Sequence, residues 1–172
     1  LDQFDQLGDD ALAAGRYDDA WAVFALLNDR GYEGAALRMQ DCRFGWAQQE
    51  MHVKHYAEAA QELQLLLDEG YTAAEPALQE CCYHQGVLAE KTLDYAAAYD
   101  YFVKAGPYAD SAEKAARFEN EYAAAEQMLA EGRYEEAAAA FAALNNYHDA
   151  AARVGQVYYQ QGEKLQLDGE WE

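Results

Sequence analysis

Aromatic side chains recur at a regular spacing along the chain, and most of them have carboxylates nearby. Phe44, Tyr83 and Tyr122 are separated by equal 39-residue intervals, and Tyr159 follows after a shorter step. Three residues before and four residues after each ring, on the same face of a helix, stand the following pairs: Asp41 and Gln48, Glu80 and Val87, Glu119 and Glu126, Gln156 and Glu163. Aromatic faces and carboxylates both attract cations. The row therefore predicts a surface for the Lys or Arg side chains of a bound segment.

The residues that we expect to form this surface are Phe44, Gln48, Glu80, Tyr83, Val87, Glu119, Tyr122, Glu126 and Tyr159. The pattern also allows a purely structural interpretation, in which the rings are buried against neighbouring helices. Asp5 stands at the equivalent position nearest the start of the chain and breaks the aromatic pattern.

No other group of reactive side chains has a catalytic or metal-binding spacing. The sequence lacks a glycine-rich phosphate loop, a nucleophile elbow and a His-Glu-x-x-His pattern. His52 and His55 flank an expected turn, with no cysteine next to them in the sequence. Acidic pairs such as Glu135-Glu136 are predicted on solvated faces, without the desolvating pocket that acid-base catalysis needs. We expect a non-enzyme without cofactor or metal.

The cysteines favour a reducing compartment. Cys42, Cys81 and Cys82 are odd in number and lie among apolar residues at helical spacing, unlike a disulfide framework. Cys42 precedes Cys81 by one 39-residue interval, so we expect it to be a buried, reduced thiol. Cytoplasmic localisation is slightly favoured over other compartments.

The charge of the chain is strongly negative. Twelve Lys and Arg against 32 Asp and Glu give a formal net charge of −20, which repels phosphate backbones and anionic lipids. No run approaches the roughly 18 apolar residues of a membrane span. We expect neither nucleic acid nor membrane contact, and a protein or basic peptide as partner. A merely solvated acidic surface is the alternative explanation of the charge.

A 39-residue period organises the whole chain. Its anchors are Tyr17, Tyr56, Tyr95 and Tyr134. Small or large apolar residues follow each anchor at offsets of 3, 7 and 10, which share one helical stripe. These positions hold Ala20, Phe24 and Leu27; Ala59, Leu63 and Leu66; Ala98, Phe102 and Ala105; Ala137, Phe141 and Leu144. Each anchor is therefore predicted to begin an amphipathic helix of about three turns.

A longer helix is predicted before each anchor, paired with the shorter one as an antiparallel hairpin. Nine residues before the anchors lie small residues, Gly8, Ala47, Gly86 and Ala125, which we expect to face the alanines of the second helices. The hairpin turns are predicted near residues 15–16, 53–55, 92–94 and 131–133. In the middle two turns Lys54 and Leu93 replace glycine. Nine helices and no strand should result.

Tyrosine-containing segments separate the repeats. They begin at Tyr32, Tyr71, Tyr108 and Tyr147, and each precedes a new helix. Asp110 and Asp149 are predicted N-caps, Asp110 with Glu113 fits a capping box, and Pro76 suits a first helical turn. The resulting repeats span about 1–34, 35–73, 74–109 and 110–148, with a partial fifth at 149–172. Because Leu1 begins within a helix and Gly169-Glu170-Trp171 restates a hairpin turn, we expect a fragment of a longer chain.

The first repeat resembles the tetratricopeptide motif through Phe4, Leu7 and Gly8, then Gly15 and Tyr17, then Ala20, Phe24 and Leu27. The later repeats keep the tyrosine, the alanine and the large apolar residue. The period of 39 instead of 34, and the absence of the closing proline, are typical of a divergent version found in large modular bacterial proteins. Sel1-like repeats are the alternative.

The resemblance implies an all-α fold, a right-handed α-solenoid of stacked hairpins whose first helices line a concave groove. It implies a protein-interaction scaffold that binds a peptide or protein segment in that groove. The relatives that grip a terminal carboxylate use Lys, Arg and Asn there, and these residues are absent here. An architectural spacer between other domains of a larger protein is the alternative function.

Overall fold

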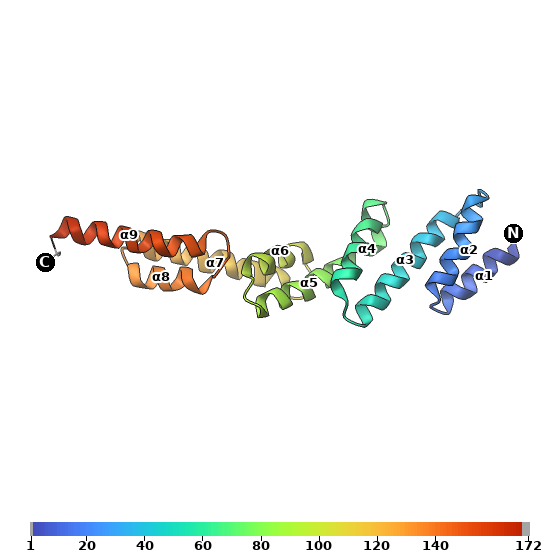
Figure 1. The fold of residues 1–172 in the computed structure, drawn as a ribbon, viewed down its shortest axis with the longest axis horizontal. Coiled ribbons are helices and arrows are strands. Elements are labelled where there is room, and N and C mark those ends of the chain that lie inside the picture. Colours follow the sequence, from blue (N-terminus) through green and yellow to red (C-terminus); the bar gives the residue numbers. More distant parts are fainter. Residues whose placement is uncertain (1, 170–172) are drawn as a thin grey trace. The chain divides into compact units, whose positions relative to one another are not determined.

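The computed structural model of the chain describes residues 2–169. Within this range the sequence prediction of nine α-helices and no strand is confirmed, with one additional short 3-10 helix, η1. The elements are α1 (Asp2–Ala13), α2 (Tyr17–Asp29), α3 (Ala35–His52), α4 (Tyr56–Asp68), η1 (Thr72–Ala74), α5 (Glu75–Lys91), α6 (Tyr95–Ala105), α7 (Ser111–Ala130), α8 (Tyr134–Ala143) and α9 (Ala150–Asp168) (Figure 1). Residue 1 and residues 170–172, which include all of the predicted fifth turn except Gly169, lie outside the described residues.

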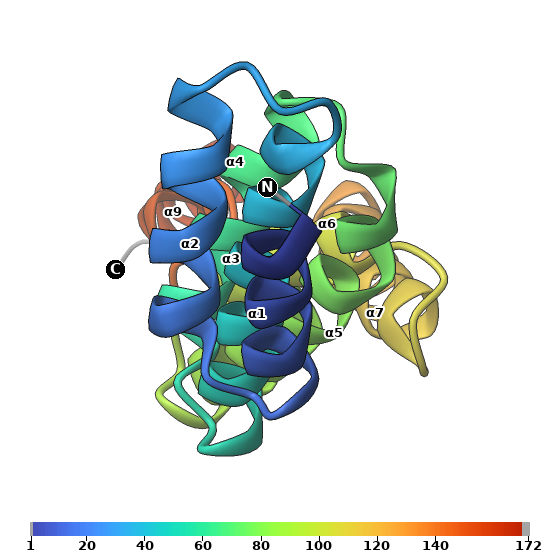
Figure 2. The same ribbon diagram turned by 90° about the vertical axis from the view of Figure 1, so that its right-hand side faces the viewer.

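The chain divides into two compact parts, residues 1–82 and 83–172, and the division falls within α5. In the N-terminal part α1 packs on α2, α2 on α3 and α3 on α4. Figure 2 shows α1 and α2 next to each other, seen from the side, with α3 behind them. In the C-terminal part α6 packs on α7, α7 on α8 and α8 on α9. Packing between consecutive helices in each part is consistent with a helical repeat. No described helix combines the length and apolar character needed to cross a membrane.

All four hairpin turns lie where the 39-residue period predicts them. The anchors Tyr17, Tyr56, Tyr95 and Tyr134 are the first residues of α2, α4, α6 and α8. Each preceding turn contains one residue in the left-handed region: Gly15 (φ 70°), Lys54 (φ 68°), Leu93 (φ 61°) and Gly132 (φ 76°). The two middle turns therefore adopt the backbone shape of the glycine turns, although a side chain makes that shape less favourable.

The apolar stripe of each second helix is buried as predicted. The alanine three residues after each anchor and the Phe or Leu seven residues after it are fully buried in all four hairpins. The first helices α3, α5 and α7 have 18, 17 and 20 residues, against 13, 11 and 10 for α4, α6 and α8. The long first helices therefore extend beyond the buried stripe of their partners.

Glycines at the hairpin crossings make room for aromatic rings. A Cβ atom at Gly8 would lie 2.6 Å from Cζ of Phe24, and one at Gly86 would lie 2.8 Å from Cδ1 of Phe102. The 39-residue pattern predicts that these small residues face the alanines of the second helices. The structure shows that the aromatic ring one helical turn after each alanine also occupies the space left by the glycine.

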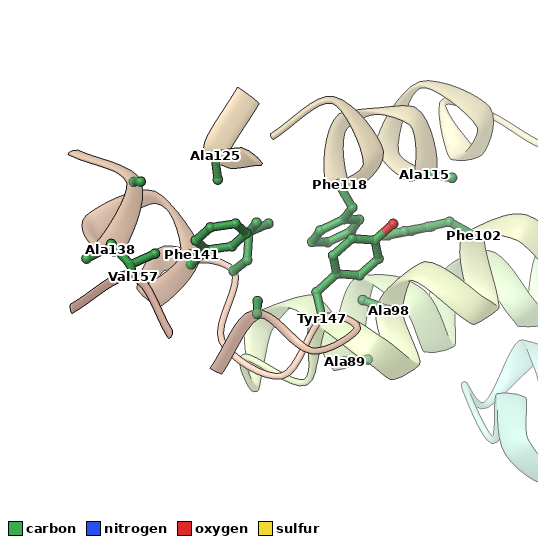
Figure 3. Packing of buried hydrophobic residues seen from close by; sticks show 13 residues of the cluster. Ala89, Ala98, Phe102, Ala115, Phe118, Ala125, Ala138, Phe141, Tyr147 and Val157 are labelled. Atoms are coloured by element: carbon green, nitrogen blue, oxygen red, sulfur yellow. The ribbon is translucent and has the colours of Figure 1, made fainter. Parts of the chain in front are cut away.

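The largest described core belongs to the C-terminal part and centres on Tyr147. This side chain comes from the loop after α8, is 2% exposed, and stacks on Phe118 of α7 with ring centroids 5.5 Å apart (Figure 3). Two smaller cores in the N-terminal part contain Cys42 and Cys81, which are buried and not joined in a disulfide, and the burial of Cys42 is as predicted. Burial raises the pKa of the Cys42 thiol to about 11. Both thiols act there as small apolar side chains.

The predicted caps are only partly correct. Asp110 and Asp149 immediately precede α7 and α9, and Pro76 lies in the first turn of α5, as expected. However, neither aspartate makes a side-chain cap hydrogen bond, so the capping box of Asp110 with Glu113 is wrong. Their carboxylates instead accept hydrogen bonds from tyrosines of the preceding first helix. A phenol donor replaces the helix amide that an aspartate cap ordinarily binds.

The loop after α8 is fastened to the start of α6. Asn146 Oδ1 accepts hydrogen bonds from the backbone amides of Tyr95 (2.8 Å) and Ala96 (3.2 Å), and its Nδ2 donates to Asp94 Oδ1 at 2.7 Å. Asn145 Nδ2 donates to the carbonyl of Leu93 at 2.8 Å. These two asparagines supply a helix cap from the neighbouring hairpin, about 50 residues away in the sequence.

Candidate functional site

Three of the four rings predicted to form a binding row pack against the loop that follows their own hairpin. Phe44 contacts Tyr71 with ring centroids 5.5 Å apart, and Tyr83 contacts Tyr108 at the same distance. Tyr122 contacts Tyr147 at 6.0 Å. These three rings are half-buried. Each therefore has a structural contact and keeps only part of its surface for a ligand.

In the C-terminal part the hydroxyl groups of this row are also engaged. Tyr83 is hydrogen-bonded to Asp110, and Tyr122 donates to Asp149. These hydrogen bonds are the main cause of the raised pKa of both phenols, because a neighbouring carboxylate opposes formation of the phenolate.

The N-terminal part also joins helix and loop by hydrogen bonds between a tyrosine and an aspartate. There the tyrosine lies in the loop and the aspartate on the helix. Tyr32 Oη, in the loop after α2, donates to Asp5 Oδ2 of α1 at 3.3 Å. Tyr71 Oη, in the loop after α4, donates to Asp41 Oδ1 of α3 at 2.8 Å. Asp5 breaks the aromatic pattern in the sequence, yet it continues the phenol–carboxylate pairing in the structure.

Two acids predicted to flank the rings have partners within the C-terminal part. Glu126 forms an ion pair with Arg153 of α9, whose guanidinium also lies 5.4 Å from the centre of the Phe141 ring. Glu119 accepts a hydrogen bond from Tyr99 Oη at 2.6 Å. The partner of Glu126 is therefore a cation, whereas the partner of Glu119 is an uncharged phenol.

The other predicted residues lie in different settings. Gln48 is exposed on α3, and Glu80 is half-buried on α5. Val87 packs against the core of the C-terminal part. Tyr159 is 66% exposed on α9, and a hydrogen bond to Glu163 raises its pKa. Of the nine predicted residues, Phe44, Gln48 and Glu80 belong to the N-terminal part and the other six to the C-terminal part.

One pocket contains two of the predicted residues, Glu119 and Tyr122. Tyr147, His148 and Asp149 complete its lining, and its volume is about 500 Å³. We call it the tyrosine pocket. Its three additional residues come from the loop after α8, where His148 adopts a left-handed backbone (φ 48°). Sequence reasoning missed them because it considered helix faces only, although the spacing from Tyr122 to Asp149 equals that from Asp5 to Tyr32.

The tyrosine pocket contains two carboxylates, and each accepts a hydrogen bond from an uncharged phenol. Glu119 and Asp149 each accept one phenol hydrogen bond, from Tyr99 and Tyr122. The hydrogen bond to Glu119 raises the pKa of Tyr99 to about 12, because the carboxylate opposes loss of the phenol proton. Within the described residues the second oxygen of each carboxylate has no further hydrogen bond, and a carboxylate accepts several. The pocket is suited to a cation with N–H donors.

No group of three or more His, Cys, Asp or Glu that could hold a metal ion occurs among the described residues. Phenols and carboxylates here are arranged as hydrogen-bonded pairs, which is typical of a structural or binding surface.

No protein-family model, no curated protein and no solved structure matches this chain. The all-α class follows from the helices and their packing alone. The resemblance to tetratricopeptide repeats remains a prediction from the sequence.

Proposed function

We propose that this chain is a non-catalytic interaction scaffold that binds a Lys- or Arg-bearing segment of a partner protein. The observation that carries the proposal is the tyrosine pocket, in which two carboxylates each keep an unused acceptor oxygen. The proposed architecture is a right-handed α-solenoid of tetratricopeptide-like hairpins. The 39-residue period and the packing of consecutive helices support it.

Recognition would rest on fixed acceptors and aromatic faces. The hydroxyl groups of Tyr99 and Tyr122 orient the carboxylates of Glu119 and Asp149, so little ordering is needed when a cation arrives. The half-buried ring of Tyr122 supplies aromatic surface beside the charges. A guanidinium fits this arrangement best, because its planar donors pair with carboxylates and its face stacks on rings.

The net charge of −20 has a separate effect. It attracts cationic segments over distances of about one Debye length, roughly 8 Å at physiological salt. Such attraction speeds encounter but discriminates poorly between basic partners. We therefore expect moderate affinity that falls with added salt, with selectivity supplied by the pocket.

The test is a titration of the whole chain with fluorescent peptides that contain arginine, matched to peptides in which citrulline replaces arginine. Citrulline keeps the shape and removes the charge. The double variant Glu119→Gln, Asp149→Asn should weaken binding of the arginine peptides by about tenfold or more, since each lost charged hydrogen bond contributes on the order of 1 kcal/mol.

The matched control is Glu135→Gln, an exposed acid of α8 outside the pocket. It changes the net charge without touching the tyrosine pocket and should leave affinity nearly unchanged. Equal loss in both variants would show that only the overall charge matters, and equal binding of the citrulline peptides would contradict the proposal.

The architectural spacer is a second candidate, favoured by one observation. Phe44, Tyr83 and Glu126 are already engaged by partners of their own part of the chain. A spacer needs such internally satisfied surfaces and no ligand. Absence of saturable binding to wild type in the same titration, even at low salt, would favour this function.

A further inference from the structure

A second pocket lies in the N-terminal part, apart from the predicted binding row. It is lined by Tyr17 and Trp21 of α2, Trp46 of α3 and the side chains of Asp18, Cys42, Arg43 and Glu62, and has a volume of about 290 Å³. An adjoining pocket shares Tyr17, Asp18 and Trp46 with it. We call the two together the tryptophan pocket. Helices α2 and α3, which supply its rings, pack on each other (Figure 1).

The aromatic surface of the tryptophan pocket is unusually open for an apolar cluster. Trp21 is 44% exposed and Trp46 is 37% exposed, while Tyr17 is half-buried. Gly45 allows the Tyr17 ring to lie against α3, because a Cβ atom at Gly45 would collide with that ring. Large exposed rings gathered on one pocket are typical of a ligand site.

The repeat itself does not require these rings. The equivalent positions one 39-residue interval further along hold Ala60 and Gln85, and those one more interval along hold Tyr99 and Ala124. The second helices there nevertheless bury their stripes fully. The pair of tryptophans is thus an addition to one step of the repeat and not part of its core.

Charge around the tryptophan pocket favours a cation. Arg43 is held by Glu62 and by Glu69, the latter with Nη1 2.8 Å from Oε1. Arg16 and Asp19, which both line the adjoining pocket, are paired with each other at 3.3 Å. Asp18 has no ion pair or hydrogen bond from a side chain among the described residues. The tryptophan pocket therefore contains three aromatic rings and, in Asp18, one carboxylate without an ion-pair partner among the described residues.

These features distinguish between classes of cation. A primary ammonium has three strongly hydrated N–H donors, and a single carboxylate replaces only part of that hydration. A trimethylammonium group has no N–H donor, holds water weakly and is attracted by the faces of Trp and Tyr. We propose that the tryptophan pocket binds a trimethylammonium group, with Trp21, Trp46 and Tyr17 facing its methyl groups and Asp18 balancing its charge.

The inference can be tested on the whole chain by NMR. The indole N–H signals of Trp21 and Trp46 are assigned with the variants Trp21→Phe and Trp46→Phe. The protein is then titrated at constant ionic strength with choline and with 3,3-dimethyl-1-butanol, its uncharged isostere. Choline should produce saturable shifts of both signals, and the isostere should bind about tenfold more weakly. Equal binding of the two, or no saturable shift with choline, would overturn the inference.

Substitutions separate the contributions of charge and ring. Trp46→Ala should weaken choline binding by about tenfold, and Asp18→Asn by about threefold. Glu58→Gln, an exposed acid in the first turn of α4, is the matched control and should have no effect. Because these side chains are exposed, the variants should keep wild-type helix content. Choline affinity unchanged by both pocket substitutions would also overturn the inference.

Two further titrations identify the source of the group. One uses a short peptide with trimethyl-lysine and the other the same peptide with unmodified lysine. Tighter binding of the trimethyl peptide than of choline assigns the pocket to a modified protein segment, and the reverse assigns it to a small molecule. Preference for the unmodified lysine peptide would contradict the proposed chemistry. The arginine titration of the tyrosine pocket is independent, so the two proposals fail separately.

Discussion

Tyr122 of α7 donates a hydrogen bond to Asp149 in the loop after α8. The same two positions of the first hairpin are occupied by Asp5 and Tyr32, which make the reverse pair, with the phenol on the loop and the carboxylate on the helix. A hydrogen bond between a phenol and a carboxylate thus fastens the loop to the first helix in both cases. The geometry is retained while the residue types are exchanged.

The Tyr122–Asp149 hydrogen bond should stabilise the C-terminal part measurably. In a double-mutant cycle with Tyr122→Phe and Asp149→Ala, we expect a coupling free energy of about 0.5–1.5 kcal/mol, measured by urea unfolding. Tyr158→Phe is the control, because Tyr158 is 55% exposed. Additive effects of the two substitutions would contradict the interaction.

Replacing the left-handed residue of the second hairpin turn, Lys54, by glycine should stabilise the fold. Lys54 is exposed and has φ 68°, a conformation that disfavours any side chain. Lys54→Gly should raise the free energy of unfolding by up to about 1 kcal/mol, and Gly15→Ala at the equivalent turn should lower it by a similar amount. Thermal unfolding of the two variants measures both. If Lys54→Gly instead lowered the free energy of unfolding, the left-handed conformation of Lys54 would not be a source of strain.

Helical glycines should respond to alanine in opposite directions. A Cβ atom at Gly45 would meet the Tyr17 ring, whereas one at Gly155 would meet nothing within 4 Å. Gly45→Ala should therefore destabilise by about 1–3 kcal/mol, and Gly155→Ala should stabilise by about 0.5–1 kcal/mol. The two melting temperatures should lie on opposite sides of the wild-type value. A shift in the same direction would refute the packing described here.

Alanines at the hairpin crossings should not tolerate enlargement. Ala98 and Ala137 are fully buried, and Ala139 is exposed two residues beyond the second of them. Ala98→Leu and Ala137→Leu should each cost about 1–3 kcal/mol of stability, against nearly nothing for Ala139→Leu. Chemical denaturation of the three variants decides this. Equal midpoints for all three would rule out close packing at the crossings.

Alkaline pH should weaken the fold through two tyrosines. The pKa of Tyr71 is raised to about 12 by burial and by its hydrogen bond to Asp41, and that of Tyr99 to about 12 chiefly by its hydrogen bond to Glu119. Unfolded tyrosine titrates near about pH 10. The folded state keeps protons that the unfolded state loses, so this stability is complete below about pH 10 and is lost as pH rises through about 12.

The measurement is a tyrosinate absorbance titration with parallel unfolding experiments at each pH. Wild type should show a late-titrating group of tyrosines that shrinks in Tyr99→Phe but not in the control Tyr158→Phe. A single transition near pH 10 in the folded protein would contradict the hydrogen bonds assigned to Tyr71 and Tyr99.

The helices could be predicted closely because one periodic signal places them. The anchors Tyr17, Tyr56, Tyr95 and Tyr134 mark the first residues of four helices, since the turn before each needs a left-handed residue at a fixed distance. The same period predicted the buried stripes. The period predicts the turns correctly even at Lys54 and Leu93, where the turn forms without glycine.

The binding residues were harder to predict because their partners come from other elements. The sequence places Glu126 near Tyr122 on a helix face, but it does not show that Arg153 of α9 reaches that carboxylate. Nor does local capping propensity show that Tyr122 competes for Asp149. Trp21 and Trp46 were missed for a different reason. They do not recur with the 39-residue period, so a search for repeated positions passes over them.

The contact of Asn145 and Asn146 with the start of α6 has a consequence for how the C-terminal part opens. Breaking the loop after α8 leaves the first amides of α6 without acceptors, and unwinding α6 leaves Asn146 without its donors. Each event therefore raises the probability of the other. The link therefore joins α6 and the loop after α8 into one cooperative unit. These two segments should open together and not one after the other.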